Sequence, residues 1–392
     1  MRKLTAQVVY PVSTPPIPNG VIVVDEQGVI QAIDTAQQHD PSTLEYYEGV
    51  LVPGFINAHC HLELSHLKGR VDTGTGLLPF LQQVVALRDV AQATIDEAIR
   101  QADAAMQQSG IVAVGDISNK TDTVPVKASS PIRYYTFVEM FDFMQDTWAE
   151  KTFNDYMQVY EAQATGNGNK KNVAPHAPYT VSPKLFALLR QVQATGSTVS
   201  IHNQETWHED ALFLRGEGDL PEFFQHFGID MCTFQPTGQT SIHYAMAHMK
   251  PECRTLFVHN TMTTPADIEA AHHWGGRNVF WVTCPNANLY IENKLPHYRY
   301  FLQADAQMCI GTDSLTSNWQ LCILEEMKTI SRYQSYVPFG KLIEWATLNG
   351  ARALSFEDEL GSFEVGKRPG VNLITGIAQG RLQANSCVQK LV

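Results

Sequence analysis

The sequence predicts an α/β fold: a (β/α)8 barrel of the TIM type with a small discontinuous β-sandwich domain built from both chain ends. Two observations support this prediction. In the middle of the chain, short apolar runs alternate with longer helical stretches, which is the pattern of repeated βα units. Both chain ends instead carry short strand patterns separated by turns. We therefore predict a sandwich of residues 1–50 and 356–392 and a barrel of residues 51–355.

Eight apolar runs lie in the predicted barrel, and near-continuous apolarity is typical of parallel strands that are buried on both faces. Helical patterns separate them, for example over residues 77–108 and 183–193. The runs are Leu51–Asn57, Ile111–Ile117, Ile132–Val138, Asn172–Pro178, Ser197–His202, Arg254–His259, Asn278–Cys284 and Met308–Gly311. Eight such runs match the eight strands of a barrel.

The chain ends show a different pattern, with short strands close together. Residues 20–24 and 29–33 flank the turn sequence Asp25-Glu26-Gln27-Gly28, which predicts a hairpin. Short strand patterns recur at residues 371–374, 381–383 and 386–388. These segments are the predicted strands of the sandwich.

Composition narrows the function classes. The 392 residues carry a formal net charge of -12 and contain no cluster of Lys and Arg, so nucleic-acid binding is not expected. No apolar run reaches the length that crosses a membrane, and no signal-peptide pattern opens the chain. The seven cysteines are scattered without a Cys-x-x-Cys pair, which favours a reducing compartment. We expect a cytoplasmic protein with a small-molecule substrate and neither a nucleic-acid nor a membrane partner.

Polar residues that can bind metals or move protons follow almost every predicted strand. Active sites of such barrels lie at the carboxyl ends of the strands, so these side chains should meet at one end of the barrel. In strand order they are His59 and His61, Asp116, Glu139, His176, His202, His259, Asn286 and Asp313. Four of these eight strand ends carry histidine, although the whole chain has only 14. The pattern predicts a metal-dependent active site.

The spacing of His59 and His61 puts both rings on the same face of a strand. Together with His202 and Asp313 they supply the number of ligands that a hydrolytic metal site needs, with one position open for water. Glu205 follows His202 by three residues and is placed to act as a general acid. His259 can hold the water or act as a base, and Asp313 can serve as both ligand and proton shuttle.

Four further residues are candidates for substrate contact. His176 ends the fourth strand, where it either touches substrate or orients a metal ligand. Glu63 and Ser65 lie on the loop after the histidine pair, and Asn318 lies on the loop after Asp313. Asp116 and Glu139 receive no role.

Several of these segments resemble signatures of the amidohydrolase superfamily. Residues 52–61 are similar to its first-strand signature, and the tail over residues 361–370 is similar to the segment that leads into its C-terminal β domain. The similarity continues through His176–Thr180, His202 with Glu205, the His259 strand, Cys284–Leu289 and Gly311–Ser314. It covers nearly the whole chain and points to the branch of chlorohydrolases and aminohydrolases, which includes aminodeoxyfutalosine and methylthioadenosine/adenosylhomocysteine deaminases.

The resemblance implies one divalent metal bound by His59, His61, His202 and Asp313, with Glu205 and His259 in proton transfer. Zinc is favoured, and Fe and Mn are alternatives. Binuclear relatives bridge their metals with a carboxylated lysine after the fourth strand, where this chain has His176-Ala177-Pro178, so one metal is expected rather than two. Relatives of this kind also tend to form homodimers.

The resulting hypothesis is a metal-dependent aminohydrolase that deaminates an aromatic N-heterocycle, with an adenine-type nucleoside as the expected substrate. Metal-bound hydroxide would attack the carbon bearing the amine, and ammonia would leave. The same site could instead hydrolyse a cyclic amide or amidine, or displace chloride from a triazine. A barrel without activity, serving as a binding subunit, is the third hypothesis, which the intact set of candidate residues disfavours.

Overall fold

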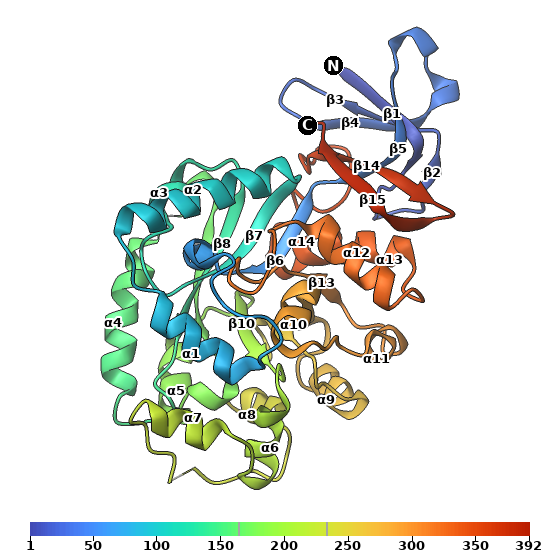
Figure 1. Cartoon of the computed structure of the whole chain (residues 1–392). Coiled ribbons are helices and arrows are strands. Elements are labelled where there is room, and N and C mark those ends of the chain that lie inside the picture. Colours follow the sequence, from blue (N-terminus) through green and yellow to red (C-terminus); the bar gives the residue numbers. More distant parts are fainter. Residues whose placement is uncertain (164, 233) are drawn as a thin grey trace.

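The computed structural model describes residues 1–163, 165–232 and 234–392. The middle of the chain forms two four-stranded sheets in which every neighbouring pair of strands is parallel. This confirms the α/β fold with buried parallel strands (Figure 1). The first sheet contains β6 (Phe55–Cys60), β7 (Ile111–Ser118), β8 (Arg133–Met140) and β9 (Lys170–Pro175). The second contains β10 (Thr198–Asn203), β11 (Arg254–His259), β12 (Val279–Thr283) and β13 (Met308–Ile310).

The two sheets meet at both edges through backbone hydrogen bonds near the carboxyl ends of their strands. His202 N donates to His176 O (2.9 Å), which joins the end of β10 to the residue after β9. The amides of Thr312 and Asp313 donate to His59 O (both 3.0 Å), which joins the segment after β13 to β6. Among the described residues, β9 and β10, and likewise β13 and β6, are joined by these hydrogen bonds and not by a regular strand pairing.

The strands are buried on both faces. On β11, Leu256 and Val258 pack into an inner cluster, whereas Phe257 packs into the outer cluster that the helices cover. On β12, Val282 faces inward and Trp281, fully buried, faces outward. This arrangement explains why the sequence shows continuous apolar runs rather than an alternation of apolar and polar residues.

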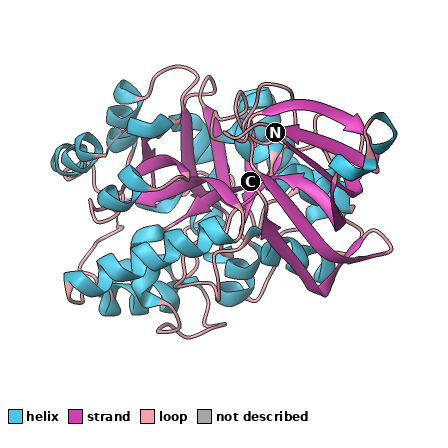
Figure 2. Ribbon diagram, turned by 90° about the horizontal axis from the view of Figure 1, so that it is seen from above, coloured by secondary structure: helices cyan, strands magenta, loops and turns pink. Residues whose placement is uncertain are grey.

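Helices surround the strands, as Figure 2 shows from above. The predicted helix over residues 183–193 is confirmed as α5, which begins after the N-cap Ser182. The stretch predicted over 77–108 is instead two helices, and the side chain of His66 contacts Arg88 O (3.1 Å) at the break. The helices are α1 (Leu77–Leu87), α2 (Gln92–Gln108), α3 (Val124–Ser129), α4 (Ala149–Ala162), α5 (Pro183–Val192), α6 (Trp207–Arg215), α7 (Leu220–His226), α8 (Ser241–His248), α9 (Pro265–Gly275), α10 (Pro285–Glu292), α11 (Tyr298–Gln303), α12 (Ile323–Tyr333), α13 (Phe339–Ala346) and α14 (Leu348–Ala353). No helix in the described ranges is long and apolar enough to cross a membrane.

Strands from both chain ends form one mixed seven-stranded sheet in the order β15-β14-β5-β1-β3-β4, with β2 paired to β1. The chain ends therefore form a single sheet, whereas the sequence predicted two sheets packed as a sandwich. Its strands, which Figure 1 shows beside the two parallel sheets, are β1 (Arg2–Val9), β2 (Ile17–Pro18), β3 (Gly20–Val24), β4 (Ile30–Thr35), β5 (Glu45–Pro53), β14 (Val371–Ala378) and β15 (Arg381–Lys390). The expected hairpin pairs β3 with β4, and the Asp25 carboxylate accepts hydrogen bonds from the amides of Gln27 and Val29 (both 2.9 Å).

The first predicted strand run, 51–57, is divided between the two parts of the molecule. Residues 51–53 complete β5 of the end sheet, and β6 starts at Phe55. Gly54 stands at the division, where a Cβ would lie 2.6 Å from Pro369 O. A residue without a side chain is therefore required, because the two segments approach too closely for any other.

Candidate metal centre and active site

Three histidines converge where β6 and β10 end. His61 Nε2 lies 3.2 Å from His59 Nε2 and 3.3 Å from His202 Nε2. Asp313, beyond β13, brings its Oδ1 within 3.6 Å of His59 Nε2 and 3.5 Å of His61 Nε2. All four side chains are buried or nearly so. The structure thus brings together the four residues that the sequence predicted as ligands.

The spacing of these atoms fits a divalent metal. Two nitrogen ligands at about 2.0 Å from a tetrahedral metal are about 3.3 Å apart, which agrees with the imidazole separations of 3.2 and 3.3 Å. The Nδ1 atom of His202 lies 2.8 Å from His176 O. A carbonyl can only accept, so Nδ1 carries a proton, and Nε2 is the ring nitrogen that would bind a metal once its own proton is lost.

The backbone around Asp313 is held tightly against β6. The Asn57 amide donates to Thr312 Oγ1 (2.7 Å), and Thr312 N donates to Asn57 Oδ1 (3.0 Å). A Cβ on Gly311 would lie 2.9 Å from His59 Cβ, so glycine permits this approach. Ser317 Oγ donates to Asp313 Oδ2 (2.6 Å), which fixes the carboxylate with Oδ1 toward the histidines.

Glu205 and His259 face each other beside the histidine cluster, with Glu205 Oε1 3.6 Å from His259 Nε2. Burial raises the pKa of Glu205 well above its usual value, and burial lowers the pKa of His259 well below its own. The pair therefore favours a protonated carboxyl next to a neutral imidazole. The Asn288 amide lies 3.2 Å from His259 Nδ1 and orients the ring.

Glu139, at the end of β8, is a site residue to which the sequence analysis gave no role. It is buried, and its Oε1 lies 3.2 Å from His202 Nδ1. Burial alone would oppose its ionisation, but His176 and His202 hold the pKa of Glu139 well below its usual range. Its position at a strand end was the one available signal.

Glu139, His176 and His202 form a second group whose ligand atoms lie within 4.8 Å of one another. His202 is shared with the first group, and its Nδ1 already donates to His176 O. His176 Nδ1 lies 2.8 Å from Thr180 Oγ1, and its ring packs 4.9 Å from that of His202. His176 thus reaches the site beside a candidate metal ligand.

The other candidates for substrate contact are buried, and their side chains already bond within the protein. Glu63 Oε2 accepts from the amides of Asn119 and Lys120 (3.0 and 3.1 Å), and Ser65 Oγ donates to Leu62 O (2.7 Å). The Asn318 amide donates to Thr312 O and Glu326 Oε1 (both 2.8 Å), and its oxygen accepts from Trp319 N. Substrate contact by these three residues stays a prediction.

With this geometry in place, the sequence was compared with known proteins. It matches the amidohydrolase family over residues 50–386. The chain belongs to the amidohydrolase family. Among curated relatives, this amidohydrolase is 27% identical over 331 residues to an adenosine deaminase of Helicobacter pylori, which covers 83% of the chain and 78% of the relative.

Solved structures share the fold of this amidohydrolase. Helicobacter pylori aminofutalosine deaminase in complex with methylthio-coformycin superposes with a TM-score of 0.78 at 24% identity, covering 96% of this chain and 93% of that one. An adenosine deaminase from Xanthomonas campestris with bound zinc gives a TM-score of 0.72 at 23% identity, covering 95% and 84%. At these identities the structural likeness establishes the fold of the amidohydrolase and not its substrate.

Proposed function

We propose that this amidohydrolase is a metal-dependent aminohydrolase that deaminates an adenine-type nucleoside. The observation that carries the proposal is the pairing of Glu205 with His259 beside the histidine cluster. An amine on an aromatic ring becomes a leaving group when a ring nitrogen is protonated and a water adds to the carbon, so an acid and a water-orienting group are needed together. Two of its relatives, an adenosine deaminase and an aminofutalosine deaminase, support the same choice.

His59, His61, His202 and Asp313 would hold the metal, and zinc is favoured because a related adenosine deaminase contains it. When bound, a divalent metal would lower the pKa of its water ligand toward neutrality, which makes a hydroxide nucleophile available. Glu205 gives its proton to the ring nitrogen. His259 orients the attacking water, and Asp313, steadied by Ser317, receives a proton and passes it to the departing amine. The added hydroxyl returns its proton to Glu205 as the C–N bond breaks, so one water is consumed, ammonia leaves and a carbonyl takes its place.

We also propose that His176 contacts the substrate, because its ring reaches the site beside His202. The two parallel sheets are proposed to form a single (β/α)8 barrel. The sequence predicted it over residues 51–355, but residues 51–53 belong to β5, so the barrel would begin at β6. The end sheet, with strands within residues 2–53 and 371–390, would then be a separate small domain. The hydrogen bonds that join β9 to β10 and β13 to β6 support this division of the chain.

The test is ammonia release from a panel of adenine nucleosides, guanine, cytosine and pterin compounds, including aminodeoxyfutalosine and methylthioadenosine, with zinc-loaded protein. Glu205→Gln keeps the shape of the side chain and removes the acid, so we expect release to fall by about 10³-fold. Glu222→Gln, an exposed glutamate on α7, is the matched control and should retain full activity. Silence across the panel from zinc-loaded protein would contradict the proposal. A ring-opened acid from a cyclic amide, or chloride from a chlorotriazine, in the same assay would then identify the alternative reaction.

A further inference from the structure

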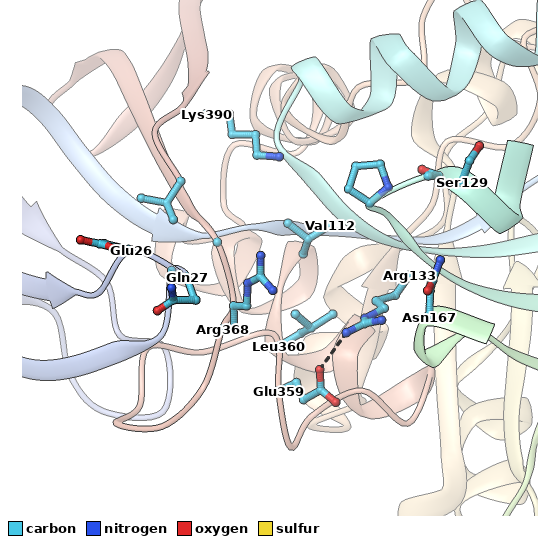
Figure 3. Close-up of a pocket in the computed structure, with 15 residues that line it drawn as sticks. Glu26, Gln27, Val112, Ser129, Arg133, Asn167, Glu359, Leu360, Arg368 and Lys390 are labelled. Carbon is cyan, nitrogen blue, oxygen red and sulfur yellow. Dashed lines mark hydrogen bonds and ion pairs between the residues drawn. The ribbon is translucent and has the colours of Figure 1, made fainter. Parts of the chain in front are cut away.

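A cavity of about 560 Å³ lies between the end sheet and the amino ends of the barrel strands. Val112, at the start of β7, and Arg133, the first residue of β8, line one side. Arg368 and Lys390 line the other (Figure 3). The metal centre is at the opposite, carboxyl ends of these strands, so this cavity is separate from the candidate active site.

The cavity gathers positive charge in a protein whose net charge is -12. Arg368 and Lys390 form no salt bridge or side-chain hydrogen bond with any described residue. Arg133 reaches in from the barrel and pairs with Glu359 at 3.4 Å, an ion pair that is largely open to solvent. Figure 3 shows the carboxylate of Glu26, another lining residue, directed away from Arg368.

Arg368 and Lys390 are exposed like charges in one cavity, and the lining carboxylates of Glu26 and Glu359 pair with neither of them, so the two cations repel each other. Partial burial and the neighbouring Arg368 lower the pKa of the Lys390 amine below its usual value, which agrees with such a repulsion. An anion placed between the two side chains would relieve it, since it would add attraction to both cations at once.

The cations are held by well-anchored backbone. Arg368 N donates to Glu359 O (3.1 Å), and the next residue, Pro369, accepts from Gly54 N (3.0 Å). Lys390 is the last residue of β15, where it pairs with Asn372 of β14. Binding of a ligand would therefore have to order only the two exposed side chains and not the backbone that carries them, which lowers the entropy that binding removes.

We propose that this cavity binds a phosphate-bearing small molecule through Arg368 and Lys390, with Arg133 as a third cation. Arginine presents a planar fork of donors that matches phosphate oxygens, and lysine adds a mobile point charge. A phosphate dianion interacts with both unpaired cations, whereas a single carboxylate carries half the charge. Because Lys390 and Arg368 belong to the end sheet and its connection and Arg133 to the barrel, the ligand would bridge the two parts of the molecule and stabilise them together.

The test uses full-length, metal-loaded protein titrated with inorganic phosphate at fixed ionic strength, followed by calorimetry and by the midpoint of thermal unfolding. UDP is the second probe, because uracil has no exocyclic amine and the proposed deamination cannot consume it. Tighter binding of UDP would assign the site to phosphorylated organic molecules, and equal binding would assign it to the inorganic anion. Both results support the proposal.

Arg368→Gln and Lys390→Gln should each weaken phosphate binding by about tenfold, since each removes one charged hydrogen-bond donor. Arg381→Gln removes an equal charge from the opposite end of β15, outside the cavity, and should bind phosphate as the unmodified protein does. Glu359→Gln should tighten binding several-fold, because it frees Arg133 and removes a nearby negative charge.

Phosphate binding that survives in both Arg368→Gln and Lys390→Gln would overturn the proposal, because the anion would then bind elsewhere, for example at the metal centre. The absence of any heat or midpoint shift in the unmodified protein would overturn it too. Neither result bears on the deaminase activity, which is measured separately by ammonia release.

Discussion

The contact between Glu139 and His202 predicts that a carboxylate outside the ligand set controls metal affinity. Glu139 Oε1 lies 3.2 Å from His202 Nδ1, the ring nitrogen that does not face the other histidines. A carboxylate in this position fixes the orientation of the imidazole and makes its other nitrogen a stronger ligand. Glu139→Gln keeps the size of the side chain and removes the charge.

The expected loss of metal affinity can be bounded from the distance between the two groups. Full unit charges at 3.2 Å would interact by about 5 kcal/mol at an effective dielectric constant of 20. A metal-bound histidine carries only part of a positive charge, and His176 O still accepts the Nδ1 proton at 2.8 Å in the variant. The loss should therefore be well below that limit, in the range of about 10- to 100-fold in metal affinity that such outer carboxylates contribute.

The assay is competition for zinc against a chelator of known affinity, followed by ammonia release at saturating zinc. Weaker zinc binding with activity largely restored by excess zinc is the expected result. Asp103→Asn is the control, because Asp103 is also buried but bonds to Ser130 and Tyr134 on the outer side of β8. Zinc affinity that stays within about twofold of the unmodified protein in Glu139→Gln would refute the reasoning.

Three further predictions concern stability. Removing the metal with a chelator should lower the unfolding midpoint, because a metal bound only to the folded state stabilises it, and an unchanged midpoint on calorimetry would contradict a bound metal. Burial raises the pKa of Glu63 to about 7, so its contribution to stability is complete below pH about 4.5 and is lost as the pH rises through about 7. Glu63→Gln should thus raise the free energy of unfolding at pH 8 and leave it unchanged at pH 4, as measured by urea titration. A higher KM of this variant would separately support substrate contact by Glu63. Lys127→Met breaks a buried 2.6 Å ion pair with Asp116 and should lower the free energy of unfolding by about 3–5 kcal/mol; a loss below about 1 kcal/mol would mean that Asp116 finds other partners.

The parallel strands could be predicted from sequence because burial on both faces makes each strand a continuous apolar run, which is a local pattern. Continuous apolar runs located all eight, and the structure shifts most of their ends by only one to three residues. Assignment of a run to a sheet is not local, however. Residues 51–57 look like one strand, but Gly54 divides them between β5 and β6 because the chain passes there from the end sheet to the first parallel sheet. At the break between α1 and α2, Arg88 O likewise contacts a side chain from another segment, His66, which a local pattern does not reveal.

The ligand cluster was predictable for a related reason: parallel strands deliver their carboxyl ends to one place, so strand-end histidines must meet. The contact of Glu139 with His202 depends on more than that rule. Glu139 lies on β8 and His202 on β10, with β9 between them, so their approach depends on the register of two successive strand pairings and on how the sheets join at β9. The sequence alone does not determine that register. Asp116 also ends a strand, but it forms an ion pair with Lys127 and contacts none of the candidate metal ligands through a salt bridge among the described residues.

The loops after the strands lead to over-prediction, because a polar residue there looks like a substrate contact even when its side chain bonds to other groups of the protein. A buried loop must satisfy its own backbone groups, and nearby polar side chains are the means. Asn318 illustrates this: its amide bonds to Thr312 O and to the buried Glu326, whose carboxylate also accepts from Asn286 N (2.8 Å). Glu326 thereby joins the segments that follow β12 and β13. A carboxylate eight residues beyond Asn318 gave no sign of this in the sequence, and such partners must be known before a polar residue beside a metal site can be assigned to substrate.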